Sequence, residues 1–180
     1  MGGRGSSGAM GGGFSNSTDR PPKYNPLHPA YFNKQGRFAS VSGAEKIFSD
    51  KYKNADREYA ISVDREGFVH NASIGNKHSV STPITGKERT LIHNHPSGSN
   101  FSDRDLKTFG SEANIKTIKA VGRERTFSIT KTNGFDQKKF GKACNNAKWP
   151  KQLSYTDGAD WWLKRNQKAL KYKYESYKTK

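Results

Sequence analysis

Residues 91–105 read LIHNHPSGSNFSDRD, and most of the expected architecture follows from this stretch. The segment from Arg89 to His93 has the composition of a short strand that ends at the histidines. The proline, glycine, serine and asparagine residues that follow are turn formers. Ser102 suits the N-cap of a helix, and Asp105 falls at the third helical position, where a carboxylate completes the cap. The stretch therefore predicts a strand, a tight loop and a helix start in succession.

The side chains of this stretch predict a zinc site. Residues i and i+2 of a strand point to the same face, so His93 and His95 direct two imidazoles the same way. Asp105 would lie beside them at the helix start. Two imidazoles and one carboxylate are a ligand set typical of catalytic Zn²⁺, with the fourth position left to water. The simpler alternative is two surface histidines and an ordinary capping box.

The same residues carry a family resemblance. HNHPSGSNFSDRD resembles the H-x-H-P…S-x-x-D signature of the JAMM/MPN+ (JAB) metalloproteases, especially the RadC-like branch and the phage- or toxin-associated JAB proteins. A looser resemblance extends over residues 42–130. It implies an MPN/JAB-like fold with cytidine-deaminase-like layering. The implied activity is that of a zinc-dependent peptidase or isopeptidase, which hydrolyses an amide bond in a protein substrate.

The resemblance also implies roles for individual residues. His93, His95 and Asp105 would hold zinc, and Ser102 would help to hold the developing oxyanion. Glu58, at a strand start, would take a proton from the attacking water and pass it to the leaving amine.

Two of these assignments have rivals. The loop from His95 to Ser102 is one residue shorter than is usual in the family, which makes Asp103 a rival ligand, although we favour Asp105. No spacing fixes a residue that comes from a separate strand. Glu58 therefore competes with three other glutamates, which are Glu45, Glu66 and Glu88.

Patterns outside the motif predict an α+β fold with a small mixed sheet flanked by helices. We expect helices over residues 42–54, from 102 onward, over 135–147 and over 157–177. We expect strands over 58–63, 68–72, 89–93, 115–121 and 126–130, with a short extended piece at 79–81. The first helix would start at Ser42, which opens an S-x-x-E capping form.

Composition divides the chain into three parts. Residues 1–41 are rich in glycine and proline, which predicts a flexible or extended segment. Residues 42–147 would form the JAB/MPN-like metal-binding domain. Residues 148–180 would form a basic C-terminal helix that packs on the domain or extends from it.

The net charge offers an alternative function. Lys and Arg number 32 against 16 acidic residues, which gives a formal charge of +16. Such a surface attracts nucleic acid or an acidic protein. Basic and aromatic residues alternate in the last predicted helix, so the chain could be a basic binding module, for nucleic acid or for a phage or host protein, with a structural or idle metal site. The simpler reading is an amphipathic helix whose Trp161, Trp162 and Leu163 pack on the core.

Composition also excludes some classes. Cys144 is the single cysteine in 180 residues, so neither a disulfide framework nor a cysteine-based zinc finger is expected. No apolar run approaches the length of about 20 residues that crosses a bilayer. We therefore expect no membrane contact and a cytoplasmic location, which would be the host cytoplasm if the protein is phage-encoded.

Overall fold

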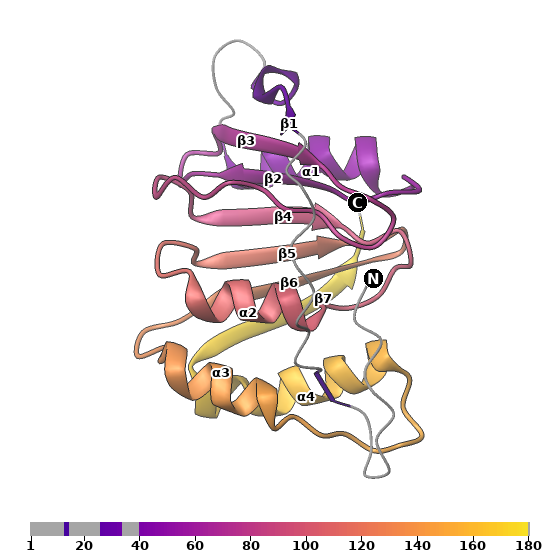
Figure 1. The fold of residues 1–180 in the computed structure, drawn as a ribbon, viewed down its shortest axis with the longest axis vertical. Helices are drawn as coiled ribbons and strands as arrows, with labels where there is room; N and C mark the ends of the chain where they lie inside the picture. The colour runs from indigo at the N-terminus through magenta and orange to yellow at the C-terminus, as the bar shows by residue number, and fades with distance from the viewer. Residues whose placement is uncertain (1–12, 15–25, 34–39, 180) are drawn as a thin grey trace.

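The computed structural model describes residues 13–14, 26–33 and 40–179. These residues fold around one mixed β-sheet (Figure 1). Its strands are Pro26–Leu27 (β1), Tyr59–Val63 (β2), Val69–Ile74 (β3), Thr90–Asn94 (β4), Thr117–Val121 (β5), Arg125–Lys131 (β6) and Tyr172–Lys178 (β7). They form one seven-stranded sheet in the order β1-β3-β2-β4-β5-β6-β7. Neighbouring strands are antiparallel except β4 and β5, which run parallel.

Helices cover both faces of this sheet. They are α1 (Val41–Tyr52), α2 (Asp103–Ser111), α3 (Gln137–Asn145) and α4 (Tyr155–Leu170), with a short 3-10 helix η1 at Pro29–Tyr31. Helices α2, α3 and α4 share the larger core with β4 to β7, whereas α1 packs with β2 and β3 on the opposite face (Figure 1). Within β4, Leu91 belongs to the larger core and Ile92 to the smaller one. The predicted α+β class is therefore found.

Helix α1 begins two residues before the position that the sequence suggested. Its N-cap is Ser40, whose hydroxyl accepts a hydrogen bond from the backbone N–H of Gly43 at 3.1 Å. The prediction of a start at Ser42 was wrong. Serine is a favoured N-cap residue at either position, and the backbone conformation decides that Ser40 takes this role. Phe48 and Tyr52 face the core, as their helical spacing predicted.

The C-terminal helix is shorter than predicted. Helix α4 ends at Leu170, and Lys171 adopts a left-handed conformation with φ 57°. The next seven residues, YKYESYK, then form β7, which pairs with β6 along its whole length. The prediction of helix over residues 171–177 was wrong. Tyr172 and Tyr174 are both buried, and this period of two is the strand signal that the abundance of lysine concealed.

The remaining elements agree with the predictions to within about three residues, apart from residues 79–81, which form no strand.

A buried glutamate fixes the irregular segment that leads to β4. The Glu88 carboxylate accepts hydrogen bonds from Asn71 Nδ2 at 2.8 Å and from the N–H groups of Thr85 and Gly86, each at 2.9 Å. Residues 80–88 are thereby held against β3 in spite of their irregular backbone.

The N-terminal segment is described in part. Most of the flexible or extended segment predicted over residues 1–41 lies outside the described residues. Phe14 is buried against Trp149 and Trp162, with ring centroids 5.3 and 5.4 Å away. Leu27 pairs with Ala72 of β3. Among the described residues, no helix is long and apolar enough to cross a membrane.

Candidate metal centre

The two histidines stand at the end of β4. His93 is the fourth residue of the strand, and His95 follows the last one. The backbone N–H of His95 donates to Val121 O at 2.9 Å, which prolongs the pairing with β5 by one residue. Both rings therefore keep the orientation of a strand, and their centroids lie 4.7 Å apart.

A tight turn leads from the histidines to α2. Gly98 donates its N–H to His95 O at 2.9 Å and has a φ of 69°, a conformation that favours glycine. Ser102 is the N-cap of α2. Its hydroxyl accepts from Asp105 N at 3.2 Å, and Asp105 Oδ2 accepts from Ser102 N at 2.7 Å. This capping box, predicted from the sequence, orients the Asp105 carboxylate toward the end of β4.

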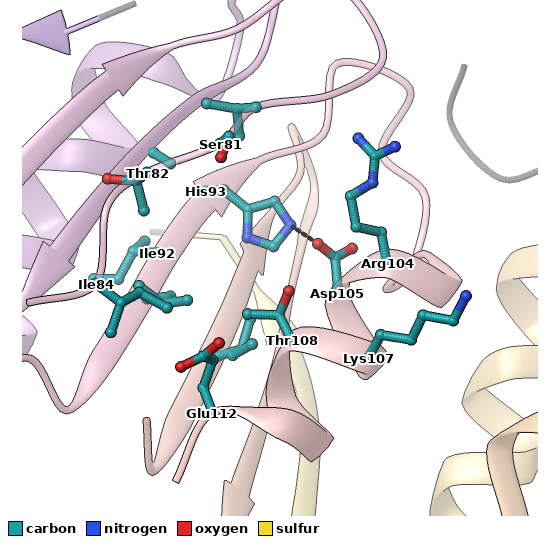
Figure 2. A pocket seen from close by; sticks show the side chains of 14 residues that line it. Ser81, Thr82, Ile84, Ile92, His93, Arg104, Asp105, Lys107, Thr108 and Glu112 are labelled. Atoms are coloured by element: carbon teal, nitrogen blue, oxygen red, sulfur yellow. Dashed lines mark ion pairs between the residues drawn. The ribbon is translucent and has the colours of Figure 1, made fainter. Parts of the chain in front are cut away.

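The three side chains converge to the geometry that a metal ion requires. His93 Nε2 and His95 Nε2 lie 2.9 Å apart. Asp105 Oδ1 lies 3.3 Å from His93 Nε2 (Figure 2), and Asp105 Oδ2 lies 3.4 Å from His95 Nε2. Four-coordinate zinc with bonds of about 2.1 Å keeps its ligand atoms about 3.4 Å apart. The donor set therefore fits such an ion, and this buried group could hold a metal.

The hydrogen bonds around His95 favour the tautomer that a metal needs. His95 Nδ1 lies 2.9 Å from Ser99 O, a carbonyl that can only accept, so Nδ1 carries the proton. Once Nε2 gives up its proton, its lone pair is directed toward His93 and Asp105.

Charge couples these groups strongly. Burial disfavours the charged form of His95, but its hydrogen bond and its attraction to Asp105 outweigh burial and raise the pKa of His95 to about 9. Burial alone would raise the pKa of the Asp105 carboxyl. The charges and hydrogen bonds of the two histidines outweigh burial, so this pKa lies well below its usual value. The site therefore holds a carboxylate that attracts a cation.

Glu58 lies beside this group. It directly precedes β2, in which Ala60 pairs with His93. Directly opposed residues share a face, as do residues i and i+2, so Glu58 lies on the His93 face of the sheet. It lines the same hollow as His95 and Asp105. Burial raises the pKa of the Glu58 carboxyl, although the nearby histidines oppose this shift.

Asn94, between the two histidines, holds the backbone on both sides of Glu58. Its Oδ1 accepts from Tyr59 N at 2.6 Å, and its Nδ2 donates to Arg57 O at 3.0 Å. Asn94 is 1% exposed, so both bonds are shielded from water. Its side-chain amide thus continues the pairing of β4 with β2 beyond Ala60. The sequence offers one signal for this residue: Asn94 lies between His93 and His95, so its side chain does not share their direction.

The rival glutamates lie at other places in the fold. Glu45 pairs with Lys119 and accepts from Tyr177 OH at 2.7 Å. The Glu88 carboxylate accepts hydrogen bonds from Asn71 and from the segment before β4, and Glu66 is exposed in the β2–β3 turn. Of the four glutamates considered from the sequence, only Glu58 lines a hollow with a predicted metal ligand.

The Ser102 hydroxyl is committed to the cap. Besides accepting from Asp105 N, Ser102 Oγ donates to Asp105 Oδ2 at 2.8 Å. It nevertheless lines the hollow that contains Glu58 and His95. Asp103, the rival ligand, lines the hollow too, but among the described residues the group whose ligand atoms converge contains Asp105.

Two hollows meet at the candidate metal centre. One, of about 410 Å³, lies between residues 80–84 and α2 and includes His93 (Figure 2). The other, of about 440 Å³, includes Glu58 and His95. Val80, Arg104 and Asp105 line both, so the two hollows flank the convergent side chains on either side. We call the two hollows together the groove, and the metal-ligand set lies where they share lining residues.

The C-terminal elements contribute to this groove, which sequence analysis did not foresee. Tyr155 of α4 lines the second hollow and donates its hydroxyl to Phe101 O at 2.7 Å. Asn100 Nδ2 donates to Tyr174 OH, in β7, at 2.7 Å. The loop between His95 and α2 is therefore held by segments more than 50 residues further along the chain.

Comparisons with protein-family models, with curated proteins and with solved structures find no match for this chain.

Proposed function

We propose that this protein is a zinc-dependent hydrolase of JAMM type, a peptidase or isopeptidase that hydrolyses an amide bond in a protein substrate. The observation that carries the proposal is the triangle formed by His93, His95 and Asp105, whose ligand atoms lie 2.9, 3.3 and 3.4 Å apart. An MPN-like fold is part of the proposal, and it is supported by a mixed sheet whose strand β4 leads through the motif into the capped helix α2.

The chemistry divides between the ion and the chain. When bound, zinc supplies Lewis-acid chemistry that polarises a carbonyl oxygen and makes water a better nucleophile. Glu58 would accept the proton of the attacking water and deliver it to the leaving amine. The raised pKa of its carboxyl suits both duties, since a group that both takes and gives a proton works best with a pKa nearer neutrality. Ser102 would orient Asp105, and its hydroxyl would have to turn from Asp105 Oδ2 to the substrate in order to donate toward the developing oxyanion.

Metal analysis of the purified protein tests the site. We expect one zinc ion per chain in the wild type, and loss of zinc in His93→Ala and Asp105→Ala. His70→Ala is a matched control, because His70 bonds Asp64 at 3.0 Å in the hairpin, away from the groove. A wild-type protein that is reconstituted with zinc and retains none would contradict the proposal.

Hydrolysis of a peptide library tests the base. Glu58→Gln should keep its zinc and lose at least about a hundredfold in kcat, the usual contribution of a general base. Glu88→Gln is not a suitable control because it would disturb the loop, whereas Glu66→Gln leaves the groove untouched. Full activity of Glu58→Gln would reassign the base.

A second candidate function is nucleic-acid binding through α4 and its C-cap, Lys171. Arg165, Lys168 and Lys171 are exposed, and among the described residues none forms an ion pair with an acidic side chain. Trp161 is 37% exposed, and the Arg165 guanidinium lies 5.0 Å above its ring. Cations that follow a helix face beside an exposed aromatic ring fit a single-stranded phosphate backbone.

Binding of labelled oligothymidine at several salt concentrations tests this second candidate. The wild type should bind with an affinity that falls steeply as salt rises, and charge reversal at Arg165, Lys168 and Lys171 should abolish binding. The matched control reverses three exposed cations elsewhere, which are Lys87, Lys116 and Arg123. Equal loss in both triple variants would show only unspecific attraction by the net charge.

A further inference from the structure

The hollow beside His93 has a definite shape and chemistry. It starts at His93 and Asp105 and runs between residues 80–84 and the length of α2 (Figure 2). Its volume of about 410 Å³ is ample for one long side chain. The aliphatic part of its wall is made by Ala60, Val80, Ile84, Leu91 and Ile118, beside the hydroxyl side chains of Ser81, Thr82 and Thr108. Such a wall favours an aliphatic side chain over a polar one.

A carboxylate stands at the far end of this hollow. Glu112 is the C-cap of α2, and Figure 2 shows its carboxylate directed toward Ile84. Among the described residues, that carboxylate forms no ion pair. Lys131 Nζ donates to the Glu112 main-chain oxygen at 2.6 Å and attracts the carboxylate through space without forming an ion pair.

The cations of the hollow lie at its other end. Arg104 and Lys107 flank Asp105 on α2, and in Figure 2 their side chains point away from Ile84 and Glu112. Seven residues of helical chain separate Asp105 from Glu112, which corresponds to about 10 Å. A hollow with aliphatic side chains along it and a carboxylate at that distance from the metal ligands fits a long stem that ends in a cation.

We propose that this hollow is a specificity pocket for a lysine or arginine side chain of the substrate, with Glu112 recognising the cationic head. The residue concerned lies within about two positions of the hydrolysed amide, because an extended chain advances about 3.3 Å per residue. Its methylene groups lie along Val80 and Ile84, and its head pairs with the carboxylate. This inference rests on the proposed hydrolase function for its biological meaning, but the pocket can be tested without it.

Cleavage preference is the first test. The zinc-loaded protein digests a mixed synthetic peptide library, and mass spectrometry gives the residues on each side of every hydrolysed bond. We expect Lys and Arg to be enriched at one position near the cleaved amide. Glu112→Gln should reduce that preference about fivefold, which is the factor that a pair worth about 1 kcal/mol confers. Glu112→Lys should shift the preference to acidic residues, and the control Glu66→Gln should change nothing.

Binding of small probes is the second test, and it requires no hydrolysis. N-acetyl-lysine-methylamide and its norleucine analogue share a stem and differ in the charged head. The lysine probe should bind about fivefold more tightly and move the amide NMR signals of Ile84 and Thr108, and Glu112→Gln should remove the difference.

The outcomes separate the two proposals. A protein that hydrolyses no peptide but prefers the lysine probe would overturn the proposed function and leave the pocket in place. A protein that cleaves peptides with no preference for Lys or Arg, or one whose preference survives in Glu112→Gln, would overturn the pocket and leave the hydrolase. Equal affinity for the two probes would overturn the pocket in either case.

Discussion

The chemistry proposed for this chain depends on how three side chains are oriented at the junction of β4 and α2. His93 and His95 are oriented by the strand, whereas Asp105 is oriented by the three hydrogen bonds that it exchanges with Ser102. A capping box is ordinarily worth about 1 kcal/mol to a helix. Here it also fixes the direction of a carboxylate toward two imidazoles, so the capping box serves the site as well as the stability of the helix.

Asn94 supplies a prediction at the same scale. Asn94→Ala removes the bonds to Tyr59 N and Arg57 O and leaves both backbone groups buried without a partner. We expect a loss of about 2 kcal/mol in the free energy of unfolding, measured by urea denaturation. Because Glu58 lies between these two groups, we also expect kcat to fall about tenfold with zinc content and KM unchanged.

A conservative variant separates positioning from stability. Asn94→Asp keeps the acceptor for Tyr59 N and loses the donor to Arg57 O, so stability and kcat should recover in part. An Asn94→Ala protein that loses stability but keeps its full kcat would show that Asn94 serves the fold alone.

At the scale of elements, α4 and β7 stabilise the site as well as the sheet. Tyr155 and Tyr174 reach the loop before α2 from these two elements. Trp149, just before α4, packs its indole where a side chain on Gly158 would lie: a Cβ there would be 2.1 Å from Trp149 Nε1. The glycine is therefore required by the contact of the indole with the helix.

Two glycine substitutions test this reading of the helices. Helix propensity alone predicts that Gly158→Ala and Gly141→Ala each stabilise by about 0.5–1 kcal/mol. Gly141 of α3 has open space where a Cβ would lie, so we expect that gain there. Gly158→Ala should instead destabilise by about 2 kcal/mol, because Trp149 is buried and must shift. Urea unfolding of the two variants in parallel measures both signs, and a gain at Gly158 would contradict the packing.

At the scale of the whole molecule, one sheet includes strands from both sides of the boundary at residue 147 that composition suggested. Residues 42–147 lack β7, so β6 would lose the seven-residue pairing on its outer edge. They also lack Trp162 and Leu163, which belong to the larger core. We therefore expect the isolated fragment 42–147 to remain unfolded.

Amide NMR dispersion and the cooperativity of urea unfolding check this expectation, with the fragment 40–180 as the matched control. The control keeps every described strand except β1 and should unfold cooperatively. A fragment 42–147 with dispersed signals and cooperative unfolding would restore the smaller domain that the sequence suggested.

The sequence by itself determined the elements whose signals are local. The alternation of β2 and β3, the spacing of Phe48 and Tyr52, and the S-x-x-D cap of α2 each involve residues a few positions apart, where steric rules and hydrogen bonds act directly. The same holds for the metal-ligand set, since both histidines and Asp105 lie within thirteen consecutive residues.

Only the tertiary structure decided the rest, because the rest depends on register and on contacts between distant segments. Pairing of Ala60 with His93 places Glu58, and nothing in the sequence fixes that register. Residues 172–178 become a strand because the outer edge of β6 is available to them, which outweighs the helix that their composition suggested. The hollow that ends at Glu112 arises where an irregular segment packs across a helix, a relation that no local pattern records.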